Sequence, residues 1–129
     1  MDLTELKALL RNSAAFSILS DEELQQLAGR FQLAHYELGQ LICRAGDPAD
    51  AFFIVYAGRA RVVGVSSAGQ EVTVGTLNRG SSFGEQGLLG DARRQYTVRA
   101  AGDLALLRLD RTDFEDLLVQ HPTLREYFE

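Results

Sequence analysis

The residues best suited to chemistry lie in segment 80–100, GSSFGEQGLLGDARRQYTVRA. Gly84 and Gly87 lack a Cβ atom, so the backbone at these positions can approach a ligand closely. Residues 86–89 are expected to form one helical turn whose free N–H groups point toward an anion. Arg94 adds a planar fork of hydrogen-bond donors that suits a phosphate group. This pattern predicts an anion-binding loop.

Glu85 lies in the same segment and needs a different partner. An ionised carboxylate only accepts hydrogen bonds, so it does not bind a phosphate, whereas a sugar hydroxyl can donate to it. The carboxylate, the guanidinium and the backbone donors together indicate a site for a ribose phosphate. The alternative from the residues alone is a flexible glycine-rich loop with a salt bridge between an arginine and a glutamate.

Other chemistries find little support. The histidines, His35 and His121, lie far apart in the chain and are accompanied by no cluster of metal ligands. No serine or cysteine lies in a nucleophile motif near either histidine. Cys43 is the only cysteine, so an internal disulfide is impossible. We therefore expect no enzyme, no metal and no cofactor, with His35 on a strand surface and His121 at a helix end.

The elements that must position segment 80–100 follow from the hydrophobic spacing. Residues 2–11 are predicted as an amphipathic helix, and Ser20 with Glu23 forms a capping box that opens a helix through Ala28. Asp110 is expected to cap a helix over 111–120, and another helix follows over 123–128. Short runs rich in Val, Ile, Phe, Tyr and Leu predict strands at 31–37, 41–44, 52–57, 60–65, 72–77, 96–100 and 105–109. Closely spaced short strands favour a barrel, roll or jelly roll over a parallel sheet.

Length and composition agree with one globular domain. The chain has 129 residues, of which 46% are hydrophobic and 24% are charged. The net charge is −5 and no segment is strongly basic, which disfavours nucleic acid and anionic membranes as partners. The longest apolar run, 51–57, is the size of a strand, and the first residues lack the pattern of a signal peptide. These features predict a cytoplasmic location, either as a cytoplasmic protein or as a cytoplasmic domain of a larger protein.

A family resemblance rests on the spacing of the motif residues. Phe83, Gly84 and Glu85 are followed after eight residues by Arg94, and after two more by Thr97. Landmarks upstream and downstream also match, namely Gly39, Gly46-Asp47-Pro48-Ala49-Asp50, Gly58, Leu109-Asp110-Arg111 and Phe114. The chain resembles the cyclic nucleotide-binding domain of cAMP-dependent kinase regulatory subunits, cyclic nucleotide-gated channels and catabolite activator-type regulators.

The resemblance implies a mainly β fold, an eight-stranded β-roll of the jelly-roll type with helices at both ends. It implies one domain over 1–129, with helices at about 2–28, the roll at about 31–109 and C-terminal helices at about 110–128. The segment that binds the phosphate, the phosphate-binding cassette, would span 80–97.

The resemblance also assigns roles to individual residues. Glu85 would accept a hydrogen bond from the ribose 2′-hydroxyl, and Arg94 would pair with the cyclic phosphate. The remaining ligand-binding positions would be Phe83, Gly84, Gln86, Gly87, Gln95 and Thr97. Arg93 is expected to face solvent. Gly87, Gln95 and Tyr96 stand where the family usually has small residues such as alanine, and Tyr96 is expected to cover the pocket mouth or to fill part of the pocket.

The implied function is a ligand sensor that binds cAMP in preference to cGMP. Its C-terminal helices would relay occupancy to a fused or docked effector, such as a transporter, channel, kinase or regulator. The alternative is a structural or interaction module whose cassette no longer binds a cyclic nucleotide, and Gln95 with Tyr96 supports it.

Overall fold

A computed structural model describes residues 2–85, 88, 93–94 and 96–128 of the chain. Its N-terminal part is helical, with α1 (Leu3–Arg11), a short 3-10 helix η1 (Phe16–Ile18) and α2 (Asp21–Ala28). The predicted capping box is confirmed: the Glu23 N–H donates to the Ser20 hydroxyl at 3.1 Å, and the Ser20 N–H donates to the Glu23 carboxylate at 2.8 Å. These bonds satisfy N–H groups that the first turn of a helix leaves open.

The middle of the chain forms two four-stranded antiparallel sheets. The order in the first sheet is β1-β8-β3-β6 and the order in the second is β2-β7-β4-β5. The strands are β1 (Gln32–Tyr36), β2 (Leu41–Cys43), β3 (Ala51–Ala57), β4 (Ala60–Val65), β5 (Glu71–Leu77), β6 (Ser82–Phe83), β7 (Thr97–Ala100) and β8 (Leu104–Asp110). The eight strands confirm the expected β-roll, although β6 is absent from the strands that the residue pattern predicts.

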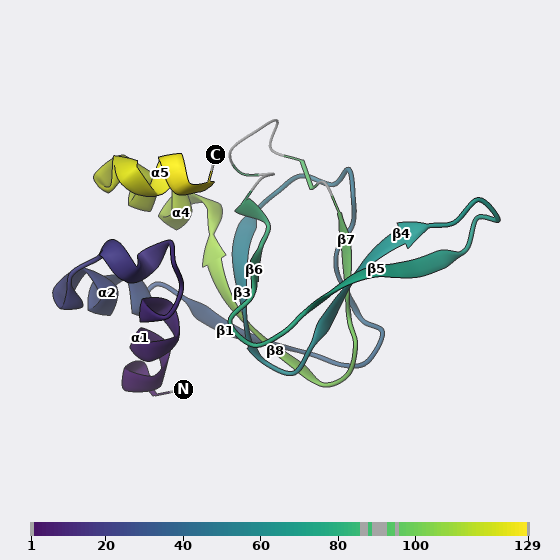
Figure 1. Ribbon diagram of the computed structural model, residues 1–129, viewed down its shortest axis with the longest axis horizontal. Coiled ribbons are helices and arrows are strands. Elements are labelled where there is room, and N and C mark those ends of the chain that lie inside the picture. Colours follow the sequence, from purple (N-terminus) through teal and green to yellow (C-terminus); the bar gives the residue numbers. More distant parts are fainter. Residues whose placement is uncertain (1, 86–87, 89–92, 95, 129) are drawn as a thin grey trace.

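The sheets enclose one core and carry a second core on the outside. Along β3, Phe53 and Val55 point into the roll, whereas Phe52 and Ile54 point toward the helices. This alternation explains why the first five residues of β3 are all buried. On the helical side, Phe52 stacks on Phe114 at 5.2 Å between ring centres. The helices therefore gather on one side of the roll, and the β4–β5 hairpin extends on the other (Figure 1).

The C-terminal part consists of α4 (Arg111–Gln120) and α5 (Pro122–Phe128). Asp110 occupies the N-cap position of α4, but the expected side-chain cap does not form. Its carboxylate instead accepts a hydrogen bond from Arg108 Nε at 3.0 Å, because the strand before the helix places a guanidinium beside it. None of the described helices has the length and apolar character needed to span a bilayer.

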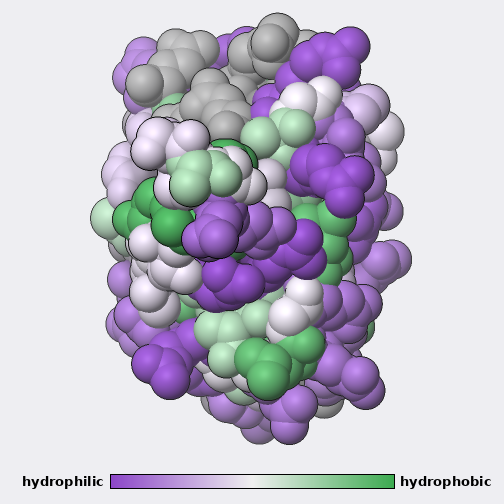
Figure 2. Space-filling view, turned by 90° about the vertical axis from the view of Figure 1, so that its right-hand side faces the viewer, coloured by the Kyte–Doolittle hydropathy of each residue, from purple (hydrophilic) through white to green (hydrophobic). Residues whose placement is uncertain are grey.

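The end of the roll that carries the β4–β5 hairpin is largely hydrophilic. Apolar side chains form separate groups on this face, between polar and charged ones (Figure 2). Val65, Val72 and Val74 of the hairpin are exposed. Scattered exposed valines of this kind are ordinary on a protein surface.

Candidate functional site

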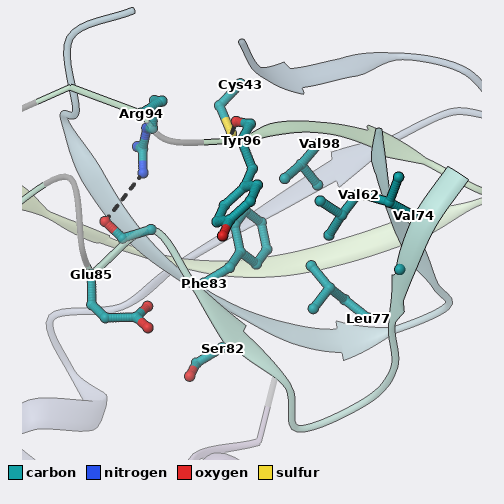
Figure 3. A pocket seen from close by; sticks show the side chains of 12 residues that line it. Cys43, Val62, Val74, Leu77, Ser82, Phe83, Glu85, Arg94, Tyr96 and Val98 are labelled. Atoms are coloured by element: carbon teal, nitrogen blue, oxygen red, sulfur yellow. Dashed lines mark hydrogen bonds between the residues drawn. The ribbon is translucent and has the colours of Figure 1, made fainter. Parts of the chain in front are cut away.

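A cavity of about 370 Å³ opens between β6 and the strands of the second sheet. Polar side chains lie at one end of it and apolar side chains at the other (Figure 3). Its lining residues are Cys43, Val62, Val74, Gly75, Leu77, Ser82, Phe83, Gly84, Glu85, Arg94, Tyr96 and Val98. Four residues of the predicted site, Phe83, Gly84, Glu85 and Arg94, thus line one cavity.

The polar end holds Glu85 and Arg94, which enter from the two ends of the cassette (Figure 3). Only 3% of the Arg94 side chain is exposed. Two atoms here, Glu85 Oε2 and Arg94 Nε, are buried and have no hydrogen-bond partner among the described residues. A buried polar group without a partner costs about 1–3 kcal/mol, so such atoms in a cavity are suited to a polar ligand.

Position 84 requires a glycine for two reasons, its backbone conformation and the close approach of neighbouring atoms. Its φ angle is +98°, in the left-handed region that favours glycine. A Cβ atom there would lie 3.0 Å from the Ala51 carbonyl oxygen and 2.5 Å from Arg94 Nη1. The same Nη1 donates a long hydrogen bond of 3.5 Å to the Gly84 carbonyl. The absent side chain therefore leaves room for the guanidinium.

Asp50, in the loop before β3, holds the other side of the Arg94 guanidinium. Arg94 Nη2 donates to Asp50 Oδ1 at 2.9 Å, and Arg108 Nη2 lies 3.5 Å from Asp50 Oδ2. Both guanidinium groups also lie over the Phe53 ring, at 5.5 and 5.8 Å from its centre. Partial burial alone raises the pKa of Asp50, but the two arginines outweigh it and hold that pKa below its ordinary value of 3.8.

The backbone of Asp50 connects the site to the C-terminal helices. Its carbonyl accepts a hydrogen bond of 2.9 Å from the N–H of Arg111, the first residue of α4. Sequence reasoning treated Asp50 only as a landmark. No local spacing identifies it, because it meets Arg94 across 44 residues of chain.

The apolar end of the cavity was also missed. Cys43, Val62, Val74, Leu77 and Val98 form it, together with the edge of Phe83 (Figure 3). The alternation of inward and outward residues along the predicted strands could have indicated these side chains.

One aromatic contact and one thiol contact hold side chains at the apolar end of the cavity. Phe83 stacks on Phe53 with 5.0 Å between ring centres. Burial raises the pKa of the Cys43 thiol, which therefore stays protonated at neutral pH, with its Sγ 3.8 Å from the Tyr96 carbonyl oxygen.

The other predicted residues have varied surroundings. The Thr97 hydroxyl accepts a hydrogen bond of 3.0 Å from the Ala45 N–H, which fixes the start of β7 to the loop after β2. Arg93 is exposed, as expected, and donates to the Gly46 carbonyl at 2.9 Å. Gln86, Gly87 and Gln95 lie outside the described residues, as does most of the helical turn expected at 86–89.

The histidines behave as the sequence indicates. His35 is exposed on β1. His121 ends α4, and its Nε2 lies 3.2 Å from Glu23 Oε2, so it ties the C-terminal helices to α2. No group of three or more His, Cys, Asp or Glu side chains that could hold a metal ion occurs within 2–85, 88, 93–94 and 96–128.

Comparison with known families defines the class of protein. The model of the cyclic nucleotide-binding domain matches residues 33–121. The chain therefore belongs to the cyclic nucleotide-binding domain family, which confirms the resemblance seen in the sequence.

Two relatives show the contexts in which similar domains occur. A regulatory subunit of cAMP-dependent protein kinase from Blastocladiella emersonii is 33% identical over 112 residues, covering 87% of this chain and 28% of the relative. An uncharacterised NTE family protein from Mycobacterium tuberculosis is 32% identical over 122 residues, covering 95% of this chain and 20% of the relative. The chain thus spans less than a third of the length of either relative.

Solved structures show the same fold. The regulatory domain of Toxoplasma gondii PKA, crystallised with cAMP, has a TM-score of 0.81 and 28% identity, covering 88% of this chain and 43% of that one. The N-terminal domain of a transcriptional regulator from Streptomyces coelicolor has a TM-score of 0.79 and 24% identity, covering 93% and 84%. The second likeness concerns the fold alone.

Proposed function

We propose that this chain binds a 3′,5′-cyclic nucleotide in the cavity between β6 and the second sheet. Arg94 faces the cyclic phosphate and Glu85 accepts a hydrogen bond from the ribose 2′-hydroxyl. The observation that carries this proposal is the pair of buried, unpartnered atoms, Glu85 Oε2 and Arg94 Nε, in one cavity. A ribose phosphate offers a hydroxyl donor to Glu85 Oε2 and a phosphate oxygen acceptor to Arg94 Nε.

The charges of the site suit this ligand. A cyclic phosphodiester carries one negative charge, which one guanidinium neutralises, and Glu85 remains free for the sugar. The family motif assigns backbone N–H groups of Gln86 and Gly87 to the phosphate. It also places Phe83, Gly84, Gln95 and Thr97 in the binding set.

The base is the less constrained part of the ligand. The described residues at the apolar end of the cavity include valines, a leucine and a protonated thiol, and none of the residues at this end carries a carboxylate or an amide. Apolar side chains form few hydrogen bonds with the polar atoms that distinguish adenine from guanine. We favour cAMP over cGMP, by no more than about tenfold.

Ligand occupancy reaches the C-terminal helices through Asp50. The phosphate competes with the Asp50 carboxylate for Arg94, and the Asp50 carbonyl holds the first N–H of α4. The Asp50 loop would therefore make different contacts in the free and the bound state. A ligand can shift a conformational equilibrium only through such a difference.

The relay ends in an effector joined or docked to the chain. The domain would act as a regulatory, non-catalytic part of a larger cytoplasmic system, where its free Cys43 stays reduced. The effector is a kinase, transporter, channel or other regulator.

A second candidate is an interaction module that binds no cyclic nucleotide. The observation in its favour is that Asp50 already pairs with the phosphate arginine at 2.9 Å. An internal carboxylate can satisfy this guanidinium without any ligand.

Isothermal titration of the 129-residue chain with cAMP and cGMP separates the two candidates. We expect saturable binding of both, weakened at least tenfold in Arg94→Ala and in Arg94→Lys, because lysine cannot reproduce the guanidinium fork. The neighbouring Arg93→Ala is the matched control and should change affinity less than twofold. Absence of saturable binding of either nucleotide would contradict this proposal and favour the interaction module instead.

A further inference from the structure

Tyr96 places an aromatic ring at the cavity, two residues after Arg94. The residue is 58% exposed although its ring is large and apolar. In Figure 3 the ring lies between the polar end, with Glu85 and Arg94, and the apolar end, with Val62 and Leu77. Among the described residues the ring has no aromatic or cation-π partner, whereas the Phe83 ring is stacked on Phe53.

The backbone holds this ring in a defined place. The Tyr96 carbonyl contacts the Cys43 thiol at 3.8 Å, and the next residue begins β7. A tyrosine loses little side-chain entropy on ordering, so an exposed ring on a fixed backbone is a suitable contact surface. Aromatic side chains are the usual platforms for nucleic-acid bases, because every base has a π face.

We propose that Tyr96 stacks on the base of the bound nucleotide, so that the site selects cyclic purine nucleotides over cyclic pyrimidine nucleotides. This inference rests on the proposed function, which directs the phosphate to Arg94 and the ribose to Glu85. The base then extends from the polar end toward Val62 and Val74, past the Tyr96 ring. A purine covers more of the ring than a pyrimidine does, whereas adenine and guanine cover it equally.

The segment that binds the phosphate thereby also binds the base. Because Arg94 and Tyr96 are separated by one residue, a single short stretch of chain contacts both ends of the ligand. The base contact then requires no side chain from α5, and no described residue of α5 lines the cavity.

Titration with cAMP and cUMP tests this inference, because the two ligands share the ribose and the cyclic phosphate. We expect the wild-type chain to bind cAMP about tenfold more tightly than cUMP. Tyr96→Phe should retain this ratio, and Tyr96→Leu should reduce it to less than threefold with little change in cUMP affinity. Tyr127→Leu is the matched control, since Tyr127 is 57% exposed and lies on α5, and its ratio should equal that of the wild type.

The outcomes separate the inference from the proposed function. An unchanged ratio in Tyr96→Leu overturns the stacking role and leaves cyclic nucleotide binding in place. Equal loss of both ligands, or tighter binding of both, also overturns it, because the ring would then shape or obstruct the site. Failure of the wild-type chain to bind either ligand overturns the proposed function itself.

Discussion

Gly84 is the residue whose replacement tests the geometry around Arg94 most directly. In Gly84→Ala the new Cβ would meet Arg94 Nη1 at 2.5 Å, in addition to the cost of a left-handed alanine, about 1–2 kcal/mol. Gly69→Ala is the matched control, because its φ is +80° and nothing lies within 4 Å of its Cβ. We expect both variants to be destabilised in urea, Gly84→Ala more than Gly69→Ala because of the additional contact, and only Gly84→Ala to lose cAMP affinity, by more than tenfold. Equal affinities would show that the Arg94 position does not matter for binding.

Glu85 should make the site selective for ribose. When 2′-deoxy-cAMP replaces cAMP, the buried Oε2 of Glu85 gains no donor, and an unsatisfied buried acceptor costs about 1–3 kcal/mol. We expect the wild-type chain to bind 2′-deoxy-cAMP at least tenfold more weakly than cAMP in competition titrations. In Glu85→Ala the two ligands should bind within about twofold of each other. A wild-type chain that does not distinguish them would remove Glu85 from the sugar site.

The sequence predicted the motif residues better than their partners. Glu85 and Arg94 lie at a fixed spacing within one segment, so local pattern was sufficient to bring them together. The sequence did not identify Asp50, because its contact with Arg94 depends on backbone hydrogen bonds of Arg94 to Asp47 and Gly46, which no spacing along the chain encodes. For Tyr96 the sequence predicts two alternatives, because the direction of its ring depends on the backbone between Arg94 and β7.

At the scale of elements, the strands with strong β-forming residues were predictable and the short one was not. β3 is a continuous apolar run, and β8 is apolar except for Arg108 and Asp110, because each strand faces a core on both sides. β6 has two residues and is followed by Gly84, so it carries no periodic signal. Its register is defined by the pairing of Phe83 with Phe53, which is distant in the sequence and so leaves no local signal.

The edge strand β5 is secured by an ion pair that crosses β4. Arg99 Nε and Nη2 donate to the two Glu71 carboxylate oxygens at 2.9 and 3.1 Å. These hydrogen bonds from Arg99 lower the pKa of Glu71 below its ordinary value of 4.5. The pair therefore contributes stability above pH 4.5, and this contribution is lost as the pH falls through the lowered value.

Acid unfolding measures this contribution. We expect the urea midpoint of the wild-type chain to fall between pH 6 and pH 3, and to fall less in Glu71→Gln, which has no charge to lose. The effect should be small because the pair is exposed to solvent. Glu126→Gln, at an exposed position of α5, is the control and should follow the wild-type curve. Identical curves for all three proteins would show that the Glu71 pair does not stabilise the folded state.

At the scale of the whole molecule, the cavity and the helices lie on opposite sides of the first sheet. The helices pack on its outer face through Phe52 and Phe114, and the cavity lies on the side of the second sheet. Asp50 is positioned to join the two sides, because its carboxylate binds Arg94 and its carbonyl accepts the N–H of Arg111.

Hydrogen exchange tests whether this connection carries the ligand signal. If the phosphate displaces the Asp50 carboxylate from Arg94, the loop before β3 loses a contact and holds the Arg111 N–H less firmly. We expect saturating cAMP to speed amide exchange severalfold in a peptide that covers the start of α4, and to leave α1 unchanged or slower. In Asp50→Ala the nucleotide should bind at least as tightly as in the wild type, because no carboxylate competes for Arg94, yet exchange in α4 should no longer respond. A response of α4 that persists in this variant would mean that the signal reaches the C-terminal helices by another route.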